Sequence, residues 1–441
     1  MKKLLLILLC LPMIGFGQVY IPDANFKAYL VGEPAINTNG DTEIQVSEAT
    51  AFNGAIYCSG MSISDLTGIE DFTALTNLYC SSNQLTSLDV SQNTALTWLF
   101  CDDNQITSLD VTQNTALDTL SCYSNQLTNL DLTANTALAF LNCSDNQLTI
   151  LDVSQNTALW GLYCQNNPLT TLDVSQNTAL TSLYCGDNQI TSLDVSANTA
   201  LTELVCGNNQ LTSLDVSNNT ALQILWCSDN LLTNIDVSSN TALTWLYCWD
   251  NQLTSLDVSN NPALTGLYCN DNQLTSLDVS NNTALTILIC DNNQLTSLDV
   301  NGADILTYLE CQHNSLTCLD ISQNLYLNQL DCSHNILNQL NTRNGNWDLL
   351  AVNSQTNSLT CIEVDNIATA ISFWLFDSFT TFNSNCNYTN PCWSTTAIQE
   401  HTTSKQLLKV TDLLGRETKQ TNQPLFYLYD DGTVEKRIVI E

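Results

Sequence analysis

Cysteine recurs along this chain at a spacing that could build a column of thiols. Of the 19 cysteines, 14 form a regular series. The interval is the one that separates Cys80 from Cys101, and the first step, from Cys58 to Cys80, is one residue longer. They are Cys58, Cys80, Cys101, Cys122, Cys143, Cys164, Cys185, Cys206, Cys227, Cys248, Cys269, Cys290, Cys311 and Cys332. In a stacked fold they form a ladder of small buried hydrophobes. Parallel side chains on stacked strands are poorly placed for disulfides. A thiolate column that binds a soft metal is the alternative.

Aspartate forms a second column with the same period. Its members are Asp89, Asp110, Asp131, Asp152, Asp173, Asp194, Asp215, Asp236, Asp257, Asp278, Asp299 and Asp320. Like charges about 4.8 Å apart in neighbouring coils should repel one another. An Asp-Val-Ser sequence before Asn is typical of an Asx turn, in which the carboxylate accepts backbone amides. Calcium bound between the coils is the alternative.

The residue pairs that nucleophilic or acid–base catalysis requires are absent. His313 and His334 share a column one repeat apart and could chelate a metal weakly, although solvated surface histidines are the simpler interpretation, and His401 lies in the tail. The carboxylates repeat with the period of the scaffold, which argues against a tuned acid–base pair. We therefore expect no catalytic residue and no enzyme activity.

Aromatic residues are concentrated at the repeat positions that should face outward. Between Leu75 and Asn335, 13 of 15 aromatic residues stand two or four residues after the first Leu of a repeat, or directly after its Cys. They are Tyr79, Trp98, Phe100, Tyr123, Phe140, Tyr163, Tyr184, Trp226, Trp245, Tyr247, Trp249, Tyr268 and Tyr308. Core residues would fall at the Leu positions, so the pattern predicts exposed aromatic surface, which usually marks a contact site.

One part of this surface is predicted to bind a ligand. The expected binding residues are Trp226, Trp245, Tyr247, Trp249 and Tyr268, on three consecutive strands, with Asp229, Asp250 and Asp271 from a flanking column that also holds Asp103, Asp145 and Asp187. Aromatic faces beside carboxylates suit glycans and equally suit basic protein partners. Alternatively the rings stabilise the sheet by cross-strand pairing. Trp249 disfavours that alternative, because it should lie at a strand exit with little to pack against.

The elements that position these residues are the coils of a solenoid. One unit runs from Leu96 to Ala116 and has the leucine-rich pattern LxxLxCxxNxL, with Cys in place of the usual third Leu. No coil can bury its apolar wall alone, so the coils must stack into one continuous core. Two asparagine columns, beginning at Asn83 and Asn93, should satisfy turn backbone groups and pair with the next rung. The fold class is an α/β-type repeat solenoid with 21-residue coils and a parallel sheet on its concave face.

The repeats resemble those of internalin J-type surface adhesins, a family of cysteine-ladder leucine-rich repeats. The phrase LDVSxNxxLTxLxCxxN carries the resemblance, which covers roughly Leu75 to Asn341. It implies an extracellular adhesion or binding role and names no ligand.

The N-terminal region is expected to comprise a signal peptide and a cap. Lys2 and Lys3 precede an apolar run too short to span a bilayer, which ends at small residues near Gly17. A short helix at residues 22–30 and a second helical stretch should cap the first coil. Between them, the spacing of Asn37, Asn39, Asp41, Glu43 and Glu48 is similar to that of a degenerate EF-hand or dockerin-type calcium loop. An ordinary polar loop is the alternative.

The C-terminal region is expected to hold a second cap and a small all-β tail. An amphipathic segment containing Ile371, Phe373, Trp374, Leu375 and Phe379 should cover the last coil. A disulfide between Cys361 and Cys386 is preferred, because Cys318 and Cys361 share a column about 10 Å apart. Three short strands with a turn at Asp431-Gly432 should follow.

The last 45 or so residues resemble the C-terminal sorting domain of type IX secretion substrates. The sequence KVTDLLGRE and the closing strand Lys436-Arg-Ile-Val-Ile carry the resemblance. It implies passage across the outer membrane of a Bacteroidota-type cell, through contact with the type IX machinery, followed by release or surface attachment.

Charge and organisation complete the expectations. The net charge is -34, and no Lys or Arg occurs between Ala28 and Thr342, which disfavours binding to nucleic acid or anionic membranes. We expect a monomer with no transmembrane segment that is exported to the outer-membrane surface or beyond and binds a protein or glycan without a required cofactor. A passive surface-layer component and a targeting module for a partner enzyme are the alternatives. The expected parts are a signal peptide (1–17), an N-terminal cap (18–74), leucine-rich repeats (75–348), a C-terminal cap (349–393) and a sorting domain (394–441).

Overall fold

Each 21-residue repeat folds into one coil that contributes one three-residue strand to a parallel sheet. In the repeat around Cys101, the strand β4 is Trp98–Phe100. Its middle residue Leu99 is fully buried, whereas the flanking Trp98 and Phe100 lie on the opposite side of the sheet. This alternation is the ordinary geometry of a strand, and it separates core from surface within three residues.

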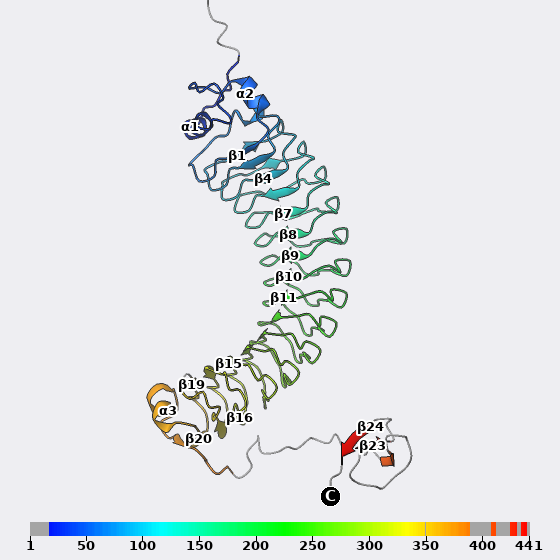
Figure 1. Ribbon diagram of the computed structural model, residues 1–441, viewed down its shortest axis with the longest axis vertical. Coiled ribbons are helices and arrows are strands. Elements are labelled where there is room, and N and C mark those ends of the chain that lie inside the picture. The colour runs from blue at the N-terminus through cyan, green and yellow to red at the C-terminus, as the bar shows by residue number, and fades with distance from the viewer. Residues whose placement is uncertain (1–16, 349, 389–406, 412–423, 430–433, 439–441) are drawn as a thin grey trace, which may run out of the picture. The chain divides into compact units, whose positions relative to one another are not determined.

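The computed structural model describes residues 17–348, 350–388, 407–411, 424–429 and 434–438. The chain forms two units, Met1–Tyr388 and Thr389–Glu441. In the first unit the coils stack into a long curved solenoid (Figure 1). The signal peptide predicted at residues 1–17 lies almost entirely outside the described residues.

The main sheet has 15 parallel strands, which follow one another in sequence order. The strands missing from its numbering belong to smaller sheets. Its strands are β1 (Ala55–Tyr57), β2 (Asn77–Tyr79), β4 (Trp98–Phe100), β6 (Thr119–Ser121), β7 (Phe140–Asn142), β8 (Gly161–Tyr163), β9 (Ser182–Tyr184), β10 (Glu203–Val205), β11 (Ile224–Trp226), β12 (Trp245–Tyr247), β13 (Gly266–Tyr268), β14 (Ile287–Ile289), β15 (Tyr308–Glu310), β17 (Gln329–Asp331) and β19 (Ala351–Asn353). From β2 to β17 the register advances by one repeat per strand, as in the pairing of Trp98 with Thr119. The predicted fold class, a parallel-sheet solenoid of 21-residue coils, is confirmed.

Smaller sheets form along other sides of the coils. The pair β3 (Leu88–Asp89) and β5 (Leu109–Asp110) precedes a four-stranded sheet made of β16 (Cys318–Asp320), β18 (Gln339–Asn341), β20 (Cys361–Glu363) and β21 (Thr381–Asn383). In that sheet Cys318 pairs with Gln339 and, one strand further, Asn341 pairs with Glu363. Cys318 and Cys361 therefore lie in one column two coils apart, as predicted.

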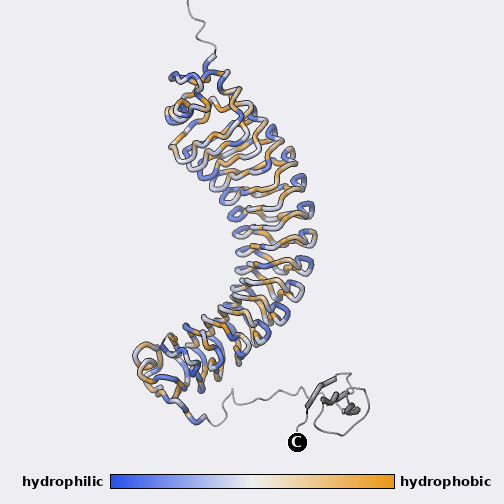
Figure 2. The backbone as a smooth tube through the Cα atoms, in the orientation of Figure 1, coloured by the Kyte–Doolittle hydropathy of each residue, from blue (hydrophilic) through white to orange (hydrophobic). Residues whose placement is uncertain are grey.

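The core is a set of stacked columns inside the solenoid. Leu96, Leu99, Cys101 and Val111 are fully buried, and the same positions are buried in the other coils. Figure 2 shows hydrophobic residues following one another along the inside of successive coils, with hydrophilic residues at the outer bends. Stability therefore comes from contacts between neighbouring coils, as in other repeat proteins.

The first asparagine column joins each coil to the coil before it. The Asn104 amide nitrogen donates to the backbone carbonyls of Cys80, Cys101 and Asp102 at 3.1, 3.1 and 3.0 Å. The Asn104 amide oxygen accepts from the backbone nitrogen of Leu85 at 3.0 Å. The predicted structural role is confirmed, but these amides bond to backbone groups rather than to one another. Backbone groups of the turn and of the preceding coil occupy both the nitrogen and the oxygen of the amide.

The second asparagine column is fully buried and only half satisfied. The Asn114 amide nitrogen donates to the carbonyls of Val90 and Asn93, both at 2.9 Å. Its oxygen accepts no hydrogen bond from the described residues, and the same holds for ten equivalent positions from Asn93 to Asn324. The donated bonds close the turn and link neighbouring coils.

The N-terminal cap is built from two short helices. Helix α1 (Ala24–Gly32) begins after Asp23, whose carboxylate accepts from the backbone of Asn25 and Phe26. Phe26 and Leu30 are fully buried, and the Tyr29 hydroxyl accepts from the backbone nitrogen of Tyr57 in β1 at 2.8 Å. Helix α2 (Val46–Ala51) and the 3-10 helix η1 (Ile69–Asp71) complete the cap. Both predicted helical stretches are confirmed.

The C-terminal cap differs from the prediction in the residues that cover the last coil. Helix α3 (Ile367–Phe373) is present, and Trp374 is buried, its indole nitrogen donating to the carbonyl of Leu350 at 2.8 Å. The other four predicted residues, Ile371, Phe373, Leu375 and Phe379, are 58%, 77%, 54% and 58% exposed. That part of the prediction was wrong, because Trp374 together with Phe382, at a ring distance of 6.1 Å, already fills the space over the coil.

The second unit contains the three strands predicted in the tail. These are β22 (Leu407–Thr411), β23 (Pro424–Tyr429) and β24 (Val434–Ile438), which pair antiparallel in sequence order. The predicted turn at Asp431-Gly432 lies outside the described residues.

Candidate functional site

The first and third residues of each main-sheet strand form one continuous surface, which we call the open face. In β12 these residues are Trp245 and Tyr247, on either side of the fully buried Leu246. The residue directly after each ladder cysteine lies on the same side and extends the face by one position, because side chains alternate along the strand. The sequence analysis expected this face to be the concave one.

Aromatic residues gather in three groups along the open face. Near the N-terminus, Tyr57, Tyr79 and Phe100 stack at ring distances of 4.8 and 5.1 Å. In the next group, Phe140 lies 5.3 Å from Tyr163 and also 5.3 Å from Trp160, which directly precedes β8 at the edge of the face. The third group contains the five predicted binding residues and is called the aromatic cluster: Trp226, Trp245, Tyr247, Trp249 and Tyr268.

The aromatic cluster is a connected group of rings on the three adjacent strands β11, β12 and β13. The Tyr247 ring lies 5.1 Å from that of Trp226 and 4.7 Å from that of Tyr268. The Trp245 and Tyr247 rings are parallel, 5.9 Å apart. Trp226 is 38% exposed, and the other four are partly exposed. The predicted residues are therefore brought together on the surface.

The expectation that Trp249 would have little to pack against was wrong. Its ring lies 5.3 Å from that of Trp226 and meets Tyr247 edge-on at 5.7 Å. The Trp249 side chain leans toward the ring of Tyr247 in its own coil and toward the ring of Trp226 in the neighbouring coil. The spacing of residues along one repeat does not reveal these contacts. The rings therefore also stabilise the sheet, as cross-strand aromatic pairs do.

Glycines make room for the larger rings. A Cβ atom on Gly266, which pairs directly with Trp245, would clash with the indole of Trp245. A Cβ on Gly207 would lie 2.9 Å from the indole of Trp226, whose nitrogen donates to the Ser228 hydroxyl at 2.6 Å. Covering an unprotected strand glycine with an aromatic ring fixes the ring in one orientation.

The three predicted binding aspartates have a backbone role that the sequence analysis missed. Asp229, Asp250 and Asp271 adopt φ angles of 52°, 48° and 53°, in the left-handed region. The same column holds Asp, Asn, His, Ser and Thr in the other coils, and the first three of these tolerate this conformation better than most residue types. Burial, followed by the charges of Asp229 and Asp271, raises the pKa of Asp250. The carboxylates thus lie close together beside the aromatic cluster, and the turn explains their position.

The cysteine ladder runs through the whole solenoid. All 14 ladder cysteines are free and buried. Burial raises the pKa of the Cys185 thiol to about 12 and shifts the other ladder thiols in the same direction. Protonated thiols are poor metal ligands, so this geometry favours the packing interpretation over a thiolate column.

Comparisons with known proteins agree with these features. No protein-family model matches the chain. Internalin J of Listeria monocytogenes serotype 4b (strain F2365) is 43% identical over 75 residues, which are 17% of this chain and 8% of that protein. The aligned segment is thus a small part of the relative's length. The solved functional domain of InlJ from Listeria monocytogenes, which includes a cysteine ladder, matches with a TM-score of 0.68 and 32% identity, over 94% of this chain and 95% of that one.

The chain belongs to the internalin J-like cysteine-ladder leucine-rich-repeat family. The crystal structure of an internalin, inlF, from Listeria monocytogenes strain 4b F2365 matches with a TM-score of 0.64 and 24% identity, over 69% of this chain and 94% of that one, and shares the fold. Among the described residues of this internalin J-like chain, none of the helices has the length and apolar character to cross a bilayer.

The aspartate column of this internalin J-like solenoid forms Asx turns, as predicted. The Asp110 carboxylate accepts from the backbone nitrogen of Thr112 at 2.9 Å, and each of the other eleven makes the same bond two residues on. Hydrogen bonds from the Thr112 hydroxyl and backbone lower the pKa of Asp110. Calcium between the coils stays a prediction.

The predicted calcium loop of the cap has its oxygens engaged by protein donors. The Glu48 carboxylate accepts from the backbone nitrogens of Asn39 and Gln45, at 3.0 and 2.9 Å. Asn37 is buried, and its amide oxygen accepts from Gly40. The two remaining carboxylates are also held: Asp41 accepts from the Glu43 backbone, and Glu43 bonds to Lys27 at 2.6 Å. No group of three or more acidic, His or Cys side chains is placed to hold a metal in the part of the chain that the structure describes, and calcium at this loop stays a prediction.

The two solenoid histidines share a column, and the preferred pair among the extra cysteines forms a disulfide. His313 and His334 stack at 4.3 Å in the left-handed turn column. Cys361 and Cys386, the preferred pair, are joined by a disulfide with Cα atoms 5.9 Å apart. This bond ties the cap to the strand β20.

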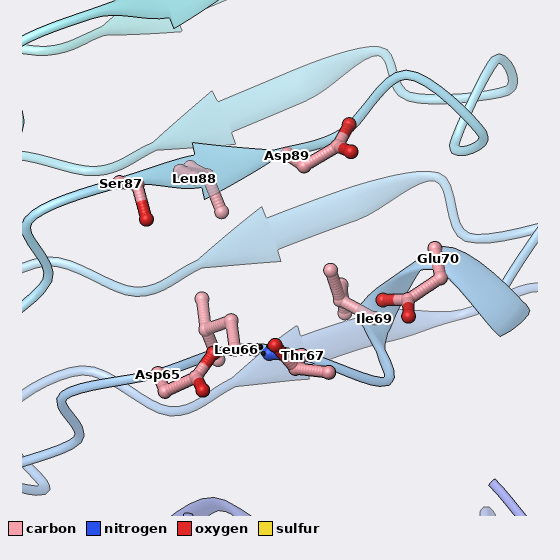
Figure 3. A pocket seen from close by; sticks show the side chains of 8 residues that line it. All are labelled: Asp65, Leu66, Thr67, Ile69, Glu70, Ser87, Leu88 and Asp89. Carbon is pink, nitrogen blue, oxygen red and sulfur yellow. Dashed lines mark hydrogen bonds between the residues drawn. The ribbon is translucent and has the colours of Figure 1, made fainter. Parts of the chain in front are cut away.

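A hollow on another side of the first coils contains carboxylates that bond to neighbouring backbone groups. It is lined by Asp65, Leu66, Thr67, Ile69, Glu70, Ser87, Leu88 and Asp89 (Figure 3). The carboxylates of Asp65 and Glu70 accept from the backbone of Thr67 and Gly68. Among the described residues, no group of three or more Asp, Glu, His or Cys side chains could hold a metal ion.

A group of hydrogen-bond acceptors that was not predicted from the sequence lies beside the aromatic cluster. Asp291, Glu310, Gln312 and Asp331, which we call the acceptor row, occupy open-face positions on the strands that follow. They occupy the same repeat positions as the outward-facing aromatic residues, so the repeat pattern predicts their place on the open face in the same way.

Proposed function

We propose that this chain is an exported recognition protein that binds an extracellular protein or glycan through the open face of its main sheet. The aromatic cluster is the observation that carries the proposal. Five large rings are held in fixed contact on three strands, and they stay partly exposed although the solenoid core does not need them. Rigid aromatic groups of this kind supply much of the affinity at protein interfaces.

The family supports a binding role, whereas the ligand and the surface location are parts of the proposal. Export by the N-terminal signal and passage through type IX machinery by the tail rest on sequence resemblance. Deleting residues 406–441 in the native host tests the second step. Retention in the periplasm supports it, and unchanged surface display would rule it out.

Arrays of glycans and extracellular proteins test the binding function with the full exported chain. The proposal expects at least one ligand whose binding falls on the order of tenfold in Trp249→Ala. Tyr326→Ala is the matched control, because Tyr326 is 61% exposed and lies between strands rather than on the open face. Equal binding by both variants would place the ligand elsewhere.

A passive structural role is the second candidate, and the ring-to-ring contacts favour it. If the rings serve only to stabilise the sheet, Trp249→Ala lowers thermal stability and no array ligand depends on it. The same two variants therefore separate the functions.

A further inference from the structure

The open face changes from aromatic to anionic just beyond the aromatic cluster. Glu310 ends β15 and Asp331 ends β17, and these two residues are directly paired. Asp291 and Gln312 each follow a ladder cysteine, and their coils are adjacent, since Asn292 donates to the carbonyl of Gln312. The acceptor row thus spans three neighbouring coils with hydrogen-bond acceptors.

The acceptor row places negative charge on a partly buried part of the sheet. Asp291 is only 7% exposed, and burial, followed by the charges of Asp271 and Glu310, raises its pKa to about 6. Glu310 and Asp331 are like charges directly opposite each other, an arrangement that is unfavourable in a sheet. Neutral donors hold both groups: the Tyr308 hydroxyl donates to Glu310, and the Ser333 hydroxyl and Asn353 amide donate to Asp331. The side-chain oxygen of Gln312 is buried and accepts no hydrogen bond from the described residues. A charge arrangement that opposes folding is a frequent sign of a binding surface.

The solenoid supplies no cation to this row. No Lys or Arg occurs between Ala28 and Thr342. Within the described residues the ion pairs are Lys27 with Glu43, in the cap, and Arg343 with Asp365, at 4.0 Å. The three carboxylates accept hydrogen bonds from neutral donors of the chain, so a compensating positive charge must come from solution or from a partner.

The spacing fits an organic cation better than a metal ion. The described residues include no group of three or more acidic, His or Cys side chains placed to hold a metal. Instead the acceptors follow one another from coil to coil, at about the spacing of neighbouring strands. Lys and Arg side chains of a polypeptide lying across the strands could meet them in turn, since these cations are donors without acceptors.

The neighbouring rings suit the same partner. The nearby charge of Glu310 contributes, after burial, to the raised pKa of Tyr268, so the aromatic cluster and the acceptor row adjoin. Arg and Lys bind over aromatic faces, and apolar side chains pack against them. Charge complementarity therefore favours a basic polypeptide as the occupant of this sheet face.

We infer that the open face from β11 to β17 binds a basic segment of a protein partner. The acceptor row receives Lys or Arg side chains, and the aromatic cluster receives the apolar side chains between them. This inference rests on the proposed function and assigns a chemical class to its ligand.

Fluorescence anisotropy with labelled peptides tests the inference on the full exported chain. The probes are peptides of about twelve residues that repeat Lys-Ser-Tyr, Gln-Ser-Tyr or Glu-Ser-Tyr, used at physiological salt. We expect the Lys peptide to bind and the other two to bind on the order of tenfold more weakly or not at all. Equal binding of the Lys and Gln peptides would overturn the inference.

A charge-matched pair of variants excludes non-specific attraction to this acidic chain. Asp291→Asn with Glu310→Gln should weaken binding of the Lys peptide roughly tenfold. Asp194→Asn with Asp215→Asn removes the same charge from two exposed Asx turns and should change it less than about twofold. Thermal melts establish that both variants fold. Equal losses in the two variants would mean non-specific attraction and overturn the inference. An array ligand that needs Trp249 but is insensitive to Asp291→Asn with Glu310→Gln would also overturn it, and the proposed function would stand.

Discussion

The indole ring of Trp245 lies over Gly266, its directly paired neighbour on the next strand. The position of the ring thus depends on the absence of one carbon atom in the adjacent coil. Trp245 in turn lies parallel to Tyr247, so this glycine helps to set the geometry of the whole aromatic cluster.

Gly266→Ala should destabilise the protein by roughly 1–3 kcal/mol, because the new methyl group forces the indole out of its place. Urea unfolding of the full chain measures the effect. The control is Gly32→Ala at the end of α1, where an added Cβ meets nothing within 4 Å and should be neutral or slightly stabilising. Equal effects of the two changes would contradict the packing described here, whereas adding Trp245→Ala to Gly266→Ala should relieve the clash.

Trp245→Ala and Trp249→Ala should each cost about 1 kcal/mol of stability, since each substitution removes the contacts between that indole and the neighbouring rings. Leu246→Ala, which removes a fully buried side chain between them, should cost about 2–5 kcal/mol. A tryptophan cost as large as that of Leu246 would assign these rings to the core.

Asp291→Asn should stabilise the protein in a pH-dependent way. Burial and neighbouring charges raise the pKa of Asp291 from 3.8 to about 6 in the folded state. A carboxyl whose folded pKa is raised opposes folding once it ionises. The loss of folding free energy is therefore absent well below pH 3.8 and fully present above about pH 6. Melting temperatures should therefore rise in the variant at about pH 7.5 and stay unchanged near pH 4. An equal rise at both values would point to a neutral packing effect.

The ladder thiols should be unreactive in the folded protein. Burial keeps them protonated and out of reach, so a thiol reagent should label none of the 14 in native buffer and all of them in denaturant. Labelling of Cys361 and Cys386 should require reduction as well. Fast labelling of the native chain would show that the ladder opens.

Calcium binding at the cap loop would require Glu48 to give up its backbone bonds to Asn39 and Gln45. On the prediction from spacing, millimolar calcium raises the melting temperature, and Asp41→Ala abolishes the rise, whereas Asp65→Ala keeps it. Absence of a rise in the wild-type chain would leave the loop as a polar cap.

The sequence predicted the features that depend on the period. Because each repeat forms one coil, the columns of Cys101, Asp110 and Asn104 follow directly from counting, as does the face to which Trp245 belongs. Contacts across coils do not follow from counting. The neighbours of Trp249 depend on how its ring leans, and the turn at Asp250 depends on a φ angle.

The C-terminal cap was harder to predict because the period ends there. With no column to compare, an apolar segment such as that around Phe373 gives no sign of which side faces the coil. Trp374 fills the space, and its neighbours are left in solvent. The acceptor row differs, because it follows the period and its place on the open face can be predicted from the repeat positions.

The hydrogen bonds of Asn104 run toward the coil before it, and this makes the stack directional, like a filament with two unlike ends. At the last turn the Asp377 carboxylate accepts from the backbone nitrogens of Thr356 and Asn357, both at 3.0 Å. The equivalent nitrogens of Asp103 and Asn104 donate to backbone carbonyls of the following coil, so here a side chain replaces those carbonyls and ends the repeated pattern. Inserting whole repeats upstream would preserve both ends, and a lineage could thus lengthen the rod without redesigning its terminus.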